Sequence, residues 1–78
     1  MEKSQSYKDY VIQADAIELY VPIRWSIAVV IERHDAGEVT TVRHQARETR
    51  LTEDEAIASS LVFGRQIVDG RHPDLPLP

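Results

Sequence analysis

The chain has 78 residues, a formal net charge of −4 and no cysteine. This length accommodates one domain with a small core. The lack of cysteine excludes a disulfide framework, a thiolate nucleophile and cysteine-ligated zinc or iron–sulfur sites. Small secreted domains usually need disulfides, so the composition favours a reducing cytoplasm. The polar N-terminus has no signal-peptide pattern, and the longest apolar run, 25–31, is far below the about 20 residues of a membrane-spanning helix.

The first half of the chain predicts two strands. Residues 1–7 are polar and are expected to be a flexible leader. Apolar and polar residues alternate over 10–16, which is the period of a half-buried strand. A turn is expected within 19–24, because Pro22 interrupts a strand ladder. The segment 25–33 is rich in β-branched residues and predicts a strand with one bulky apolar face.

The second half predicts a hairpin, a third strand and a helix. A hairpin loop is expected over 34–37, because Gly37 adopts left-handed conformations easily. The third strand covers 39–46 but is weakly patterned after Val42. Thr52 and Glu55 form a capping-box pattern that begins a helix, and Gly70 is a natural end for it. The proline-rich residues 71–78 are expected to be a disordered tail.

These elements predict an α+β domain over 8–70. Connections of hairpin length favour a three-stranded antiparallel β-meander, with one C-terminal α-helix packed on one face. One helix covers only one face of the sheet, and the middle strand carries Ala28 and Val30 on the other. These two side chains are either scattered exposed apolar groups, which are common, or part of a surface shared with a partner.

The segment 19–24 is the second candidate contact surface. It contains Tyr20, Val21 and Ile23, and such apolar residues are unusual in an exposed loop. Either the loop folds onto the end of the core, or it binds another chain with Tyr20 as an anchor.

Charge is unevenly distributed along the chain. Residues 1–23 and 51–78 are acidic, and the only basic stretch lies within 43–50. It supplies four candidate contacts for an anion or nucleic acid: Arg43, His44, Arg47 and Arg50. The alternative is a solvated strand edge, whose charges discourage aggregation, and the acidic composition favours it.

Residue patterns for catalysis are nearly absent. The glycines are isolated, so no phosphate loop is expected. No histidine has the spacing that places two ligands on one helix face. The acids 53–55 are explained by helix capping. The sequence therefore predicts no enzyme activity, no cofactor and no metal.

Four segments carry a resemblance to known proteins. They are the strand 10–16, Arg24-Trp25-Ser26, Thr52-Glu53-Asp54-Glu55-Ala56 and the helix end 63–70. With them the chain resembles a family of small, uncharacterised bacterial β-β-β-α proteins, a likeness that implies the fold over about 8–70 and no activity. A looser likeness of layout is to HicB-type antitoxins, whose helix also opens Thr-x-x-Glu-Ala, although their typical Pro-Gly-Cys segment is missing here.

Two functions are therefore expected from the sequence. The first is a non-enzymatic protein-interaction module that uses the open sheet face or the 19–24 loop. Its partner is another protein or a second copy of the chain. The second is a nucleic-acid-associated or antitoxin-like regulator that uses the 43–50 stretch.

Overall fold

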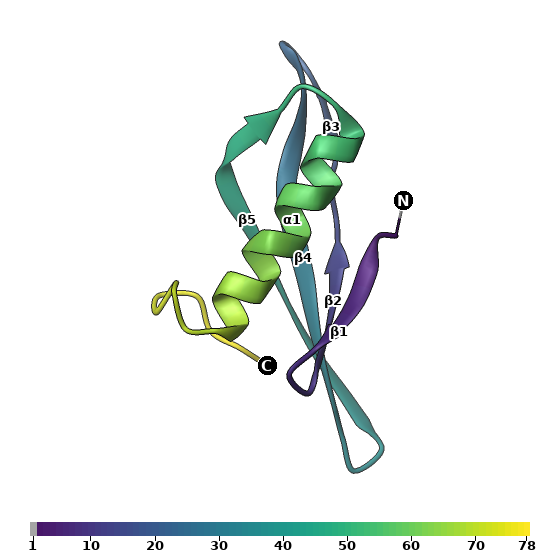
Figure 1. Ribbon diagram of the computed structural model, residues 1–78, viewed down its shortest axis with the longest axis vertical. Coiled ribbons are helices and arrows are strands. Elements are labelled where there is room, and N and C mark those ends of the chain that lie inside the picture. Colours follow the sequence, from purple (N-terminus) through teal and green to yellow (C-terminus); the bar gives the residue numbers. More distant parts are fainter. Residues whose placement is uncertain (1) are drawn as a thin grey trace.

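The fold is a five-stranded antiparallel sheet with one helix packed against it (Figure 1). The computed structural model describes residues 2–78. The elements are β1 (Ser4–Tyr7), β2 (Tyr10–Ala14), β3 (Glu18–Tyr20), β4 (Ile23–Asp35), β5 (Glu38–Arg50) and α1 (Glu53–Val68). No helix within residues 2–78 is long and apolar enough to cross a membrane.

Strand β4 organises the sheet. Strands β2 and β3 pair with different parts of β4, and β5 also pairs with it. Strand β1 pairs with β2 and extends the sheet by one strand. The predicted α+β class, the antiparallel sheet and the C-terminal helix are confirmed, whereas the prediction of three strands is wrong.

The two additional strands arise in the first 20 residues. Ser4–Tyr7 form β1, so the prediction of a flexible leader is wrong for these residues. The predicted strand 10–16 ends early as β2, and β3 follows after a break. Ser26 bridges this break, because its Oγ accepts from the Ile17 amide (2.9 Å) and its own amide donates to the Ile17 carbonyl (2.9 Å). Both β2 and β3 therefore stay attached to β4.

Helix α1 begins and ends where the sequence predicts. The Thr52 hydroxyl accepts from the Glu55 amide (3.2 Å) and donates to the Glu55 carboxylate (3.0 Å). A capping box usually places the Glu carboxylate on the amide of the first residue; here the Glu55 carboxylate accepts from the Thr52 hydroxyl instead. Gly70 has a φ of 81°, which ends the helix in the left-handed region.

The core lies between α1 and one face of the sheet. Its buried side chains come from β2, β4 and α1: Ile12, Ile27, Val29, Ile31, Phe63 and Ile67. Gly64 is buried at the closest approach of helix and sheet. A Cβ on this residue would overlap Ile12 Cγ2 and lie 2.8 Å from Val29 Cγ2. The helix can therefore approach the sheet this closely only with glycine at position 64.

Polar contacts tie β1 to the end of the helix. The Tyr7 hydroxyl donates to the Asp69 carboxylate (2.8 Å), and Lys8 Nζ forms an ion pair with it (2.5 Å). The hydrogen bond from Lys8 is the main reason that the pKa of Asp69 lies below its ordinary value of 3.8. The same hydrogen bond is the main reason that the pKa of Lys8 lies above 10.5.

Replacement of Gly64 tests the close approach. We expect Gly64→Ala to lower the free energy of unfolding by about 1–2 kcal/mol, because overpacking outweighs the better helix propensity of alanine. Urea denaturation followed by Trp25 fluorescence measures the change. The matched control is Ala58→Gly at an exposed helix position, which changes helix propensity without overpacking the core. A Gly64→Ala variant as stable as the wild type would contradict the close approach.

The Asp69 contact predicts a pH dependence of stability. A carboxylate with a lowered pKa stabilises the fold fully above 3.8, and this contribution is lost as the pH falls through the folded-state pKa. The Lys8 contribution has the opposite sign, present below 10.5 and lost as the pH rises through its raised pKa. Between about pH 5 and pH 2, we expect the unfolding midpoint of the wild type to fall more than that of Asp69→Asn. Asp74→Asn removes an equal charge elsewhere and is the control; identical pH profiles for wild type and Asp69→Asn would refute the contribution.

Candidate functional site

The most exposed apolar segment is the turn between β3 and β4. We define the hairpin tip as residues 19–23. Its side chains are exposed to 96% at Val21, 74% at Tyr20 and 68% at Ile23. The tip stands at one end of the molecule (Figure 1), where the helix also begins, and it does not fold onto the core. The structure thus leaves three of the predicted contact residues available to a partner.

The hairpin tip has a well-ordered base. Tyr20 pairs with Ile23 and Leu19 with Arg24 in the β3–β4 register. Arg24 Nε in turn donates to Thr49 Oγ1 on β5 (3.1 Å). Because both strands of the hairpin are bonded to the sheet, the backbone that carries the apolar side chains is held in place.

The sheet face opposite the helix is polar. Ala28 is fully buried, and Val30 is half-buried. Polar side chains bond to one another across this face: Arg43 Nε on β5 donates to Asp15, just after β2 (2.5 Å), and Gln13 Nε2 on β2 donates to Glu32 on β4 (2.8 Å). Ala28 therefore offers no surface to a partner, and Val30 offers little.

The basic stretch does not form one surface. Arg43 is paired with Asp15 and also bonds to Gln45 (3.2 Å), whereas the neighbouring His44 donates to the carbonyl of Pro76 (2.8 Å). Successive strand residues point to opposite faces, so these two side chains diverge.

The two remaining arginines of the stretch lie further along β5. Arg50 Nε donates to Ser59 on α1 (3.0 Å), and its Nη1 lies 3.5 Å from Glu48. Arg47 is exposed. The four predicted anion contacts are therefore divided between surfaces, and Arg43 and Arg50 already have carboxylate partners.

The sequence did not predict a groove between α1 and β5. The register of β4 and β5 changes between Ser26 and Ala28, so that β5 carries additional residues there. At this irregularity the Ala28 amide donates to Ser60 Oγ on the helix (3.1 Å). A hollow of about 450 Å³, which we call the α1–β5 groove, opens beside it. The weak patterning after Val42 was the one signal of this irregularity.

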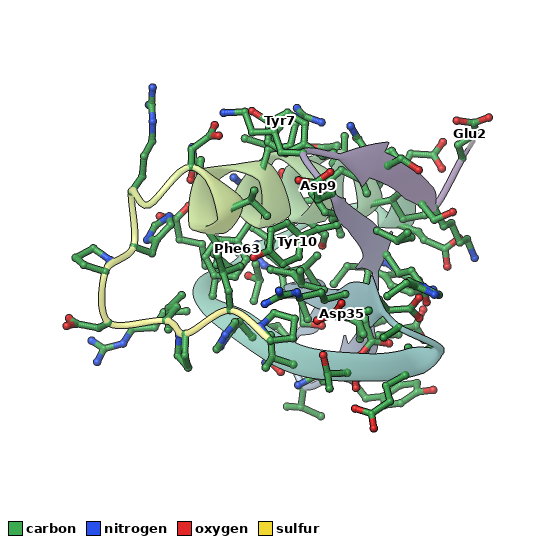
Figure 2. All side chains as sticks on the ribbon, turned by 90° about the horizontal axis from the view of Figure 1, so that it is seen from below. Glu2, Tyr7, Asp9, Tyr10, Asp35 and Phe63 are labelled. Atoms are coloured by element: carbon green, nitrogen blue, oxygen red, sulfur yellow. The ribbon has the colours of Figure 1, made fainter. Side chains whose placement is uncertain are left out.

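The C-terminal segment borders the same region. Leu75 and Leu77 pack against the core cluster, and His44 holds the Pro76 carbonyl. His72 bonds to Gln66 (3.0 Å) and packs edge-on against Phe63, with ring centroids 5.2 Å apart. Figure 2 shows Phe63 between the helix and this segment. The segment 71–78, which the sequence predicts to be a disordered tail, thus packs against the core in the structure.

The titratable side chains do not gather at one place. His34 bonds to Glu32 (3.2 Å), His44 to a main-chain carbonyl, and His72 to an amide side chain. In the described part of the chain, 2–78, no group of three or more His, Asp or Glu side chains is placed to hold a metal ion. The two candidate binding features of the structure are the exposed hairpin tip and the α1–β5 groove.

Comparisons with protein-family models, with curated proteins and with solved structures found no match.

Removal of the apolar side chains of the C-terminal segment tests its packing. We expect Leu75→Ser with Leu77→Ser to lower the free energy of unfolding by about 1–3 kcal/mol, since both half-buried side chains would lose apolar contact. Urea denaturation measures the loss. Val39→Ser, at an exposed position on β5, is expected to change stability by less than about 0.5 kcal/mol. Equal stability of the double variant and the wild type would show that the segment is not packed.

Proposed function

We propose that the protein is a non-enzymatic interaction module that binds another protein chain through the hairpin tip. The observation that carries the proposal is the exposure of Tyr20, Val21 and Ile23 on a hairpin whose base is bonded to the sheet. The cytoplasmic location expected from the cysteine-free composition is part of the same proposal.

A partner that covers the hairpin tip removes its apolar side chains from water, which is favourable. Large apolar side chains gathered at one exposed place gain about 25 cal/mol for each Å² that a partner removes from water. Because the hairpin is already ordered, binding loses little conformational entropy, which favours affinity. Tyrosine is among the residues that most often dominate binding energy in interfaces. Tyr20 is accordingly the proposed anchor, with Val21 and Ile23 beside it.

The regulator that binds nucleic acid is the alternative, and it has less support. Arg43 and Arg50 are paired with carboxylates, and His44 points away from the face that Arg43 occupies. A salt-sensitive mobility shift with RNA or DNA, lost on charge reversal at Arg43, Arg47 and Arg50, would favour this alternative. The likeness to HicB-type antitoxins belongs to it and stays a prediction.

The hairpin tip is tested by the double variant Tyr20→Ser with Ile23→Ser. Affinity capture from the native cytoplasm at near-native level is expected to recover a protein with the wild type and to lose it with the variant. The side chains are exposed, so the fold should lose no more than their cross-strand contact, about 0.2–1 kcal/mol. Circular dichroism checks that the variant is folded.

Val39→Ser is the matched control for this experiment. Val39 is 55% exposed and lies on the β4–β5 hairpin, away from the hairpin tip. The control variant is expected to recover the same protein as the wild type. Equal recovery and equal self-association of the wild type and the tip variant would refute the proposed function.

A further inference from the structure

We propose that the hairpin tip of one copy of the chain occupies the α1–β5 groove of a second copy. This inference rests on the proposed function and names the partner as the chain itself. It joins two features of the structure, an exposed apolar projection and a hollow with an apolar floor, that lie close to each other in the fold.

The α1–β5 groove suits an uncharged occupant. Its floor and walls include Ile27, Ala46 and Phe63. Its two charged side chains, Arg50 and Glu48, lie 3.5 Å apart and neutralise each other. The other polar pair at its border, Gln66 and His72, is joined by a hydrogen bond of 3.0 Å. The groove therefore offers a charged ligand no unpaired charge with which to form an ion pair. An apolar group would displace water from the floor at a small desolvation cost.

The hairpin tip has the matching chemistry. Residues 19–23 carry no charge, and Tyr20 and Ile23 lie side by side as a strand pair. A hollow of about 450 Å³ has the size of a small ligand site, which is room for a few large side chains. A tyrosine ring has an apolar body and a hydroxyl at its end. Tyr20 therefore fits a groove with an apolar floor and polar atoms at its border.

The position of the two features favours a closed dimer. Arg50 borders the groove and is paired with Trp25 across the sheet. Ile23 lies on β4 two residues before Trp25, which is a distance of about 7 Å at the usual rise of a strand. The tip therefore lies beside the Arg50 end of the groove, which extends from there along α1 to Gln66 and His72. A twofold axis at that end would bring each tip to the groove of the other copy, giving two equal contacts and no free site for a third copy.

The first test is sedimentation with one variant for each feature. The wild type is expected to form a dimer with a dissociation constant between about 1 μM and 1 mM, as for a small interface. Tyr20→Ser with Ile23→Ser removes the apolar tip. Ala58→Trp fills the groove from an exposed helix position that lines it. Each variant is expected to weaken the dimer at least tenfold, and Val39→Ser is expected to leave it unchanged. Circular dichroism and urea denaturation establish that every variant is folded.

The second test is a mixture of the two variants. The tip variant keeps an intact groove, and the groove variant keeps an intact tip. A 1:1 mixture is therefore expected to form a heterodimer through one remaining contact, at concentrations where neither variant associates alone. Native mass spectrometry separates the heterodimer from both homodimers by mass.

The results that overturn the inference differ from those that overturn the proposed function. A wild type that stays monomeric up to about 1 mM, assembly that grows beyond the dimer, or a mixture without heterodimer overturns the inference. Loss of self-association in the tip variant alone would mean that two tips contact each other, which also overturns it. In each case, capture that depends on the tip still supports the proposed function.

Discussion

The absence of a side chain at position 64 allows helix α1 to lie against the sheet. At this point the helix meets Ile12 and Val29, and no space remains for a methyl group. Four residues earlier, Ser60 bonds to the sheet: its hydroxyl accepts from the Ala28 amide and donates to the Ala56 carbonyl (2.7 Å). A small residue and a hydroxyl thus fix the helix to β2 and β4.

The same arrangement explains why a groove exists on the β5 side. The helix is held close to β2 and β4, and the irregularity in β5 lies where Ser60 meets Ala28. Ser60 on the helix satisfies the Ala28 amide at this place, and no buried side-chain nitrogen or oxygen in residues 2–78 lacks a hydrogen-bond partner. The space between α1 and the irregular part of β5 is left as the groove, and the C-terminal segment borders it.

Local patterns in the sequence predicted the elements that are defined by local physics. The β-branched run of β4, the cap at Thr52 and the stop at Gly70 are of this kind. Strand β1 was missed because Ser4–Tyr7 carry little apolar character; their pairing with β2 and contacts such as Gln5 to Arg65 (2.7 Å) hold them. The turn before β2 uses Lys8 and Asp9 at positive φ, which the sequence does not signal with glycine. Such contacts between distant residues have no signature within one segment.

The candidate surfaces were predictable to different degrees. The hairpin tip is visible in the sequence, because Pro22 forces a turn within an apolar stretch. The burial of Ala28 could not be predicted from the sequence, since it depends on how tightly neighbouring strands and their side chains pack around a small residue. The division of the basic stretch follows from strand alternation, which places Arg43 and His44 on opposite faces. The groove depends on the irregularity of β5 and on the position of the helix together, and no single segment encodes it.

The two long strands reach beyond the part of the sheet that the helix covers. Residues 34–39 form a two-stranded ribbon that is exposed throughout and is paired only within itself. The amides of this ribbon can therefore exchange with solvent through local opening, whereas those around Ile12 and Val29 exchange only when larger parts of the fold open. We therefore expect strand β4 to show both slow and fast amide exchange: slow at its buried middle and fast at its exposed end.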